Sequence, residues 1–225
     1  MSSAEGSHVT DVLIVDDHAF LRRGLAEIID DLPETSVCGE AAGASEALQC
    51  IRNRRPDVAV IDISLGDGNG IELTKEIKAQ WPEIKVLISS MHDESLYAER
   101  ALRAGALGYI NKSDEVEQFI RALRRVMAGE VYLSAAMTNR MLSQVVSHRD
   151  EPSRSEMQKL SDRELEVFEM IGNGIGTKEI AAKLDLSRKT VETYREHIKS
   201  KLGLRNGTEL TQHAVRWVLE QTPAV

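Results

Sequence analysis

Acidic side chains follow two apolar segments of this sequence, and their chemistry is that of metal binding and phosphoryl transfer. Asp16 and Asp17 follow the run Asp11–Val15, and Asp62 follows the run Val58–Ile61. Hard carboxylate oxygens suit Mg²⁺, which keeps several waters when a protein binds it. Three crowded carboxylates are costly without a cation, whereas a bound metal ion leaves one of them able to attack a phosphoryl group. These aspartates therefore predict a magnesium-dependent phosphoryl site, if the fold brings them together.

A serine and a lysine occupy equivalent places later in the chain. Ser90 follows the apolar run Lys85–Ser89, and Lys112 follows Gly108–Asn111. A lysine there can pair with phosphate oxygens, and a hydroxyl can donate a hydrogen bond to one. Taken singly, Lys112 could be a solvated loop lysine, Ser90 a turn residue and Asp62 an acid that happens to end a strand. The specific signal is that five suitable residues all stand at strand ends.

These side chains can converge only if the apolar runs are neighbouring strands of one sheet. Strand and helix signals alternate five times, and the short loops between them force parallel strands with right-handed crossovers. The predicted strands are Asp11–Val15, a segment starting at Val37, Val58–Ile61, Lys85–Ser89 and Gly108–Asn111. The predicted helices are Phe20–Ile29, Ala44–Arg52, one beginning with Ile71–Ile77, Leu96–Ala104 and Val116–Met127. We predict an α/β fold, a doubly wound, five-stranded parallel sheet, in which adjacent first and third strands bring the three carboxylates to one edge.

Beyond Tyr132 the strand signals stop and helical patterns follow. Ser134–Val146 could form one helix, and the polar, proline-containing segment His148–Ser155 has the composition of a flexible linker. Four further helices then form a small all-α domain. A Ser161–Glu164 capping box is predicted to start the first helix, and Thr177 is predicted to cap the second. Ser187 is predicted to cap the third helix, Arg188–Leu202, and the fourth is predicted to run from about Thr208 to Leu219.

The third of these helices carries an excess of positive charge. From Ser187 to Arg205, six Lys or Arg residues outweigh two Glu, a charge of +4. A short turn before a basic helix indicates a helix-turn-helix, although a solvated charged face is a common alternative. Polar side chains among the cations favour a helix that reads a DNA groove. The candidate DNA contacts are Lys178, Arg188, Lys189, Thr190, Glu192, Thr193, Tyr194, Arg195 and Lys199.

The charge of the chain is divided between its two parts. The 225 residues carry a net charge of −8, which argues against a molecule that binds polyanions over its whole surface. The segment Met157–Arg216 holds 11 Lys or Arg and 9 Asp or Glu, so it is +2 while the remainder is −10. This asymmetry predicts two domains with different partners.

Nothing in the sequence predicts a membrane partner or an oxidising environment. No apolar run approaches the roughly 18 residues of a membrane span, and Met1–His8 lacks the basic and apolar regions of a signal peptide. Cys38 and Cys50 lie in apolar contexts without zinc-ligand spacing, so we expect buried free thiols. These features predict a cytoplasmic protein.

Residues 11–130 resemble the receiver domain of two-component response regulators. The matching pieces are Asp16-Asp17, Asp62 with its glycine-rich loop, Ser90-Met91 and Gly108–Lys112. The resemblance implies that Asp62 accepts a phosphoryl group from the phosphohistidine of a sensor histidine kinase. It also implies a Mg²⁺ ion held by Asp17, Asp62, the backbone carbonyl of Ser64 and, through water, Asp16.

The same resemblance implies which residues respond to phosphorylation of Asp62. Lys112 would contact the phosphoryl group, and Ser90 and Tyr109 would be a switch pair, the hydroxyl moving toward phosphate and the ring turning inward. Phosphorylation adds about −1.5 to −2 charge at the mouth of the sheet, and packed cores move between discrete states. Without the resemblance, Tyr109 is simply a half-buried strand aromatic. His18 is interpreted as a loop residue rather than a catalytic base.

Residues 160–219 resemble the LuxR-type DNA-binding domain, and the order of the two domains resembles the NarL/FixJ subfamily. The matching residues are Leu160–Glu164, Gly174, Lys178–Ala181, Ser187, Thr190-Val191 and Lys201–Gly203. Many members carry a lysine where Glu192 stands, and some a histidine where Tyr194 stands. Because Glu192 could accept a hydrogen bond from cytosine N4, its base preference stays open. The predicted boundaries are a receiver at 10–131, a linker with a helix at 132–158 and the DNA-binding domain at 159–222.

The sequence thus predicts a phosphorylation-dependent transcription regulator rather than an enzyme. Its expected partners are a histidine kinase, the major groove of double-stranded DNA and, when phosphorylated, a second copy of itself. One rival is a phosphatase of the haloacid dehalogenase type, which also forms an aspartyl phosphate. That family has a second Asp where Ser64 stands here, so this rival is disfavoured. The other rival is an orphan regulator whose receiver serves only for dimerisation.

Overall fold

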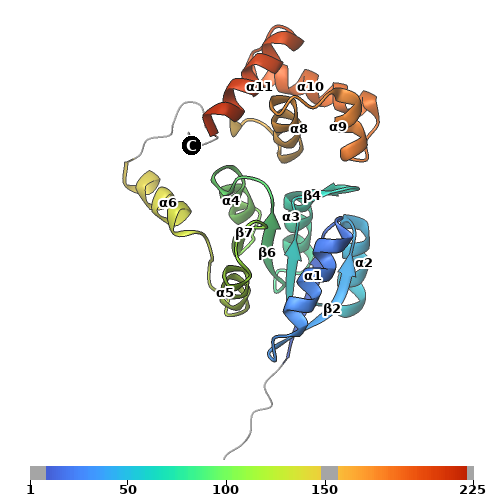
Figure 1. Cartoon of the computed structure of the whole chain (residues 1–225), viewed down its shortest axis with the longest axis vertical. Coiled ribbons are helices and arrows are strands. Elements are labelled where there is room, and N and C mark those ends of the chain that lie inside the picture. The colour runs from blue at the N-terminus through green and yellow to red at the C-terminus, as the bar shows by residue number, and fades with distance from the viewer. Residues whose placement is uncertain (1–8, 148–156, 222–225) are drawn as a thin grey trace, which may run out of the picture. The chain divides into compact units, whose positions relative to one another are not determined.

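The computed structural model describes residues 9–147 and 157–221, which divide into two compact units (Figure 1). The first unit runs to Ser143 and the second starts at Gln144. The predicted linker segment His148–Ser155 and the N-terminal Met1–His8 lie outside the described residues. In the part of the chain that is described, no helix is both long and apolar enough to cross a membrane.

The first unit is built on a five-stranded parallel sheet, as predicted. Its strands are β1 (Thr10–Val15), β2 (Thr35–Ala41), β3 (Val58–Ile61), β6 (Lys85–Ser90) and β7 (Gly108–Asn111). Their order is β2-β1-β3-β6-β7, so the first and third strands are neighbours. β2 begins two residues before the predicted Val37, and Ser90 is the last residue of β6 instead of following it.

Helices cover both faces of this sheet. They are α1 (Ala19–Asp30), α2 (Ala44–Arg54), α3 (Gly70–Gln80), α4 (Glu94–Arg103) and α5 (Val116–Met127). Alternate residues of the inner strands, such as Ile14 and Val60, pack with Ile29 of α1 and Leu123 of α5 in one core. The strand residues between them are buried as well, which is why these strands read as continuous apolar runs.

The apolar pattern of α1 does not all face the core. Phe20 is 97% exposed and Leu21 is 41% exposed, whereas Ile29 is fully buried. At 3.6 residues per turn, Phe20 lies about 180° around the helix from Ile29. The prediction of one apolar face from 20 to 29 was therefore too broad.

After α5 the chain adds to the sheet edge before it forms α6 (Ala135–Ser147). The Tyr132 N–H donates to Leu107 O at 2.9 Å, and the Tyr109 N–H donates to Tyr132 O at 3.1 Å. This parallel bridge covers the outer side of β7.

The second unit is helical, with α8 (Asp162–Gly172), α9 (Thr177–Lys183), α10 (Arg188–Leu202) and α11 (Gly207–Gln221). The Ser161–Glu164 capping box and the Ser187 cap of α10 are confirmed. The predicted Thr177 cap is wrong, because Gly176 is the N-cap and Thr177 is already helical. An N-cap needs an extended backbone, which Gly176 has and a helical residue lacks.

The core of this unit lies between α8, α10 and α11. Phe168 and Trp217 meet edge to face with ring centroids 5.5 Å apart. A Cβ atom at Gly172 would overlap Ala214 of α11, so the absent side chain allows α8 and α11 to approach closely.

The two cysteines differ from expectation. Cys38 and Cys50 are free thiols, but both are only half-buried. Burial still raises the pKa of Cys38 to about 11, so this thiol is a poor nucleophile at neutral pH.

Candidate functional site

The carboxylates of Asp16, Asp17 and Asp62 gather at the carboxyl edge of the sheet. Pairing fixes the backbone here, since the Asp62 N–H donates to Val15 O at 2.8 Å. Asp16 and Asp62 are buried, and Asp17 is exposed. One ligand atom from each aspartate and from His18 falls in a group whose members all lie within 4.8 Å of one another. The convergence expected from the strand order is therefore present.

Lys112 lies between the two buried carboxylates. Its Nζ is 2.7 Å from Asp62 Oδ2 and 2.7 Å from Asp16 Oδ2, and its side chain is only 5% exposed. The solvated-loop interpretation of Lys112 is therefore wrong. Its backbone N–H donates to Ser90 O at 2.9 Å, which ties the end of β7 to the end of β6.

One ammonium group does not fully compensate two buried carboxylates. Asp16 Oδ2 is buried and, among the described residues, receives no hydrogen bond of good geometry despite the nearby Lys112. Burial raises the pKa of Asp62; the charge of Lys112 opposes that shift and the charge of Asp16 adds to it. This surplus of negative charge, presented by hard oxygen ligands, fits a divalent cation such as Mg²⁺.

The loop after Asp62 is more ordered than its glycines suggested. β4 (Ser64–Leu65) and β5 (Gly68–Asn69) form a short antiparallel hairpin, and the Asn69 side chain caps α3. A Cβ atom on Gly70 would overlap the carbonyl oxygen of Asp62. Gly70 thus allows the start of α3 to pack directly against the backbone at the end of β3.

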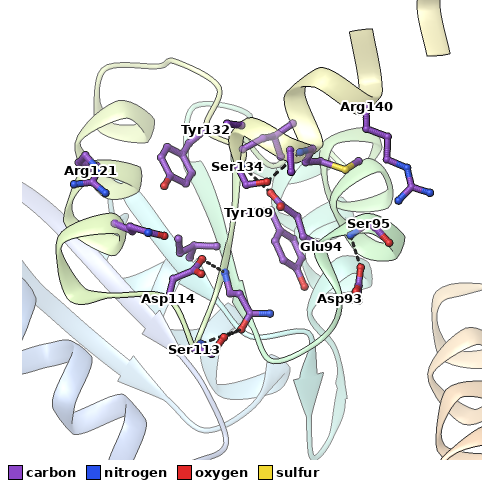
Figure 2. A pocket seen from close by; sticks show the side chains of 17 residues that line it. Asp93, Glu94, Ser95, Tyr109, Ser113, Asp114, Arg121, Tyr132, Ser134 and Arg140 are labelled. Atoms are coloured by element: carbon purple, nitrogen blue, oxygen red, sulfur yellow. Dashed lines mark hydrogen bonds between the residues drawn. The ribbon is translucent and has the colours of Figure 1, made fainter. Parts of the chain in front are cut away.

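Ser90 and Tyr109 both point into the molecule. Ser90 is buried, and its hydroxyl lies near enough to the Asp62 carboxylate to oppose the rise in the pKa of that group. Tyr109 is fully buried, not half-buried, and its hydroxyl donates to the carbonyl of His92 at 2.7 Å. The structure therefore has the ring turned inward (Figure 2).

His92 is a residue that the sequence did not single out. Its Nε2 lies 2.9 Å from Ser64 Oγ, and its ring contacts Tyr97 of α4 in a tilted arrangement, with ring centroids 4.6 Å apart. Its carbonyl accepts from Tyr109 and, at 3.2 Å, from the Asn111 side chain. The loop between β6 and α4 is thereby joined to the hairpin after Asp62 on one side and to β7 on the other. The only sequence signal was its place just after Ser90-Met91.

His18 also belongs to the cluster. It is a loop residue, the N-cap of α1, as interpreted from the sequence. However, its Nδ1 lies 2.7 Å from Asp17 Oδ1 and 3.5 Å from Asp16 Oδ1. Its backbone N–H donates to Asp16 Oδ1 at 2.8 Å, which helps to orient that carboxylate.

A cavity of about 620 Å³ separates α4, β7, α5 and the start of α6 (Figure 2). Across its rim, Glu94 Oε1 accepts from the Ser134 N–H at 2.9 Å. Tyr109 and Tyr132 stand on its walls and are joined by their backbones. The inward tyrosine, the first turn of α4 and the chain leaving the first unit are thus directly connected.

The candidate DNA contacts do not all lie on one face of α10. Lys178 of α9 and Arg188, Lys189, Glu192 and Thr193 of α10 are exposed. The half-buried candidates are Thr190, Tyr194, Arg195 and Lys199. Thr190 contributes its hydroxyl to the Ser187 cap at 2.8 Å. The exposed members are thus the candidates whose side chains are most open to solvent.

Comparison with protein families gives two matches. Residues 12–124 match the family described as the response regulator receiver domain, and residues 158–214 match the bacterial regulatory proteins of the luxR family. The oxygen regulatory protein NreC of Staphylococcus haemolyticus is 38% identical over 209 residues, which cover 91% of this chain and 96% of that protein.

Solved structures share the fold of all or part of this chain. A LuxR-family two-component response regulator from Aurantimonas is 32% identical, with a TM-score of 0.58 over 62% of this chain and 99% of that chain. RcsB from Salmonella enterica, solved on promoter DNA with a phosphomimetic, is 22% identical, with a TM-score of 0.61 over 92% of this chain and 98% of that chain. At that identity, the likeness to RcsB concerns the fold.

Proposed function

This chain belongs to the response regulators that carry a receiver domain followed by a luxR-type DNA-binding domain, and we propose that phosphorylation of Asp62 controls its binding to DNA. The observation that supports this most is the buried Asp62 carboxylate, which has a raised pKa and lies beside Lys112, Ser90 and two further acids. The proposed boundaries remain 10–131 for the receiver, 132–158 for the linker and 159–222 for the DNA-binding domain.

In the proposed reaction, a carboxylate oxygen of Asp62 attacks the phosphorus of a kinase phosphohistidine. The P–N bond breaks as the P–O bond forms, and the imidazole leaves. Lys112, already 2.7 Å from Asp62 Oδ2, is placed to pair with oxygens of the transferred group. Asp17, Asp62, the Ser64 carbonyl and, through water, Asp16 would hold Mg²⁺. When bound, the ion would screen the charge that develops during transfer.

The phosphoryl group would act through the residues around it. Lys112, which pairs with Asp62 in this structure, and Ser90, which lies near it, are placed to donate to that group. Ser90 adjoins the His92 loop, whose carbonyl holds the inward Tyr109. We propose that this loop and the Glu94–Ser134 hydrogen bond carry the change to the linker. The phosphorylated protein would then dimerise and place two α10 helices in successive major grooves.

The acceptor is tested with acetyl phosphate and Mg²⁺, followed by intact mass. The full chain should gain one phosphoryl group, and Asp62→Asn should gain none. Asp31→Asn, a change of an exposed acid outside the cluster, is the matched control and should behave as the wild type. Absence of any mass gain, with DNA binding intact, would favour the orphan regulator instead. Repeated turnover of a phosphomonoester would revive the phosphatase rival.

The DNA-binding part is tested by salt dependence. A dimer with roughly 6 to 10 phosphate contacts should lose about three to five decades of affinity between 50 and 200 mM salt. Fluorescence anisotropy with the phosphorylated chain measures this slope. A flat response would contradict the assignment of α10 and its flanking cations as the DNA-binding surface.

A further inference from the structure

Two acids, Glu192 and Glu196, are among the exposed side chains of the basic helix. On α10, Val191 and Ile198 are buried, and the residues turned away from them include Lys189, Glu192 and Glu196, all exposed. Glu192 and Glu196 are one helical turn apart on this side. Glu196 was not among the DNA contacts predicted from the sequence.

The cations that balance these acids lie closer to the protein. Arg195 Nε is 3.8 Å from Glu192 Oε2, and Lys199 Nζ is 2.9 Å from Glu196 Oε1. The side chains of Arg195 and Lys199 are each 18% exposed, against 50% for Glu192 and 67% for Glu196. A ligand that approaches this side of α10 therefore meets carboxylate oxygens before it meets these two cations.

Carboxylates at a DNA surface are repelled by phosphates and by most groove edges. In the major groove, guanine presents two acceptors, and adenine places its N7 acceptor beside its N6 amino group. Cytosine N4 is an amino donor without such an adjacent acceptor, and Glu can accept a hydrogen bond from it. A carboxylate on the groove-facing side is therefore tolerated best opposite cytosine.

We propose that Glu192 and Glu196 together read cytosine at two positions of the target site, with Arg195 and Lys199 as positioning residues that hold the carboxylates. The two acids are separated by about 6 Å along the helix axis, against a rise of about 3.4 Å per base pair. The two cytosines should therefore lie one or two base pairs apart in each half-site. This inference rests on the proposed DNA binding, and it adds Glu196 as a second specificity-determining residue.

The test is selection of binding sites from random duplex DNA by the full chain treated with acetyl phosphate. The wild type should enrich a half-site with both cytosines. Glu196→Ala should lose the preference at one position by about 5- to 160-fold, the range for one mismatched base pair, and Glu192→Ala should lose it at the other. Glu196→Gln should shift the first position toward adenine, which Gln can pair with through N6 and N7. Glu220→Ala, an exposed acid at the end of α11, is the control and should leave the motif unchanged.

The outcomes separate this inference from the proposed function. A wild-type motif without the paired cytosines, or one that Glu196→Ala leaves intact, would overturn the reading role while DNA binding stands. Failure of the wild type and both alanine variants to enrich any sequence would overturn the proposed function, and this inference with it.

Discussion

Both units bury carboxylates, but they compensate them differently. In the first unit, Asp16 and Asp62 share the single ammonium group of Lys112. In the second unit, buried Glu164 accepts from Lys201 Nζ at 2.5 Å and from the Ser161 N–H at 2.7 Å. Glu164 therefore has its own cation and a backbone donor, whereas Asp16 and Asp62 are under-compensated.

The pKa values shift in opposite directions as a result. Burial raises the pKa of Asp62, since its partners do not offset the loss of water. Burial also acts on Glu164, but the hydrogen bonds from Lys201 and Ser161 outweigh it and lower that pKa. A buried acid with enough hydrogen-bond donors and positive charge stabilises a fold. An under-compensated buried acid is a site that can bind a cation or accept a covalent group.

Glu164 should show the largest effect on stability. Glu164→Ala leaves the Ser161 N–H and the Lys201 ammonium without their acceptor, so the second unit should lose about 2 to 3 kcal/mol. Urea denaturation, monitored by hydrogen exchange of the amides in α8 and α10, would measure this loss of stability. Glu220→Ala is the exposed control. A loss under 0.5 kcal/mol would mean that Glu164 is not the support described here.

Asp62 should show the opposite sign. Asp62→Asn removes a buried charge that shares Lys112 with Asp16, so without Mg²⁺ the first unit should gain about 1 to 2 kcal/mol. The same urea titration, read on the amides of β1 and β3, gives the value, with Asp31→Asn as the neutral control. Destabilisation by Asp62→Asn would show that the cluster is compensated after all.

Mg²⁺ should stabilise only the first unit. At ten times its dissociation constant the ion adds about 1.4 kcal/mol if it binds the folded state alone. Thermal unfolding with and without MgCl₂ would show this gain in the wild type and its loss in Asp17→Asn. An equal shift of both units would indicate a general salt effect.

The pH dependence should be the smallest effect. Because the pKa of Asp62 is raised in the folded protein, its charged carboxylate lowers the free energy of unfolding. This destabilisation is absent below the ordinary aspartate pKa and grows as the pH rises to the pKa of Asp62 in the folded protein. The lowered pKa of Glu164 means that its contribution is present above the ordinary glutamate pKa and fades as pH falls. The gain from Asp62→Asn and the loss from Glu164→Gln should therefore both shrink in acid. A gain from Asp62→Asn that persists at the lowest pH would contradict the charge explanation.

The sequence predicted the sheet well because periodicity and strand ends are local signals. The bounds of β3, β7 and α5 agree with the structure, and the strand ends placed Asp62 and Lys112 at one edge. What it missed depends on tertiary contact. The bridging position of Lys112, the His92 contacts with Ser64 and Tyr97, and the exposure of Phe20 arise from packing between distant segments.

Residue types also did not predict which charged side chains of α10 are the most exposed. The segment Ser187–Arg205 carries a net charge of +4, yet Arg195 and Lys199 are the less exposed members of their ion pairs. Their long stems can follow the helix surface, which a charge count does not reveal.

The most direct test of the under-compensated cluster is a crystal grown with Mn²⁺ in place of Mg²⁺. Anomalous scattering should show one ion bound by Asp17 and Asp62, and Asp62→Asn should weaken or remove it. An empty cluster at high Mn²⁺, with Lys112 still paired to Asp16 and Asp62, would contradict this account.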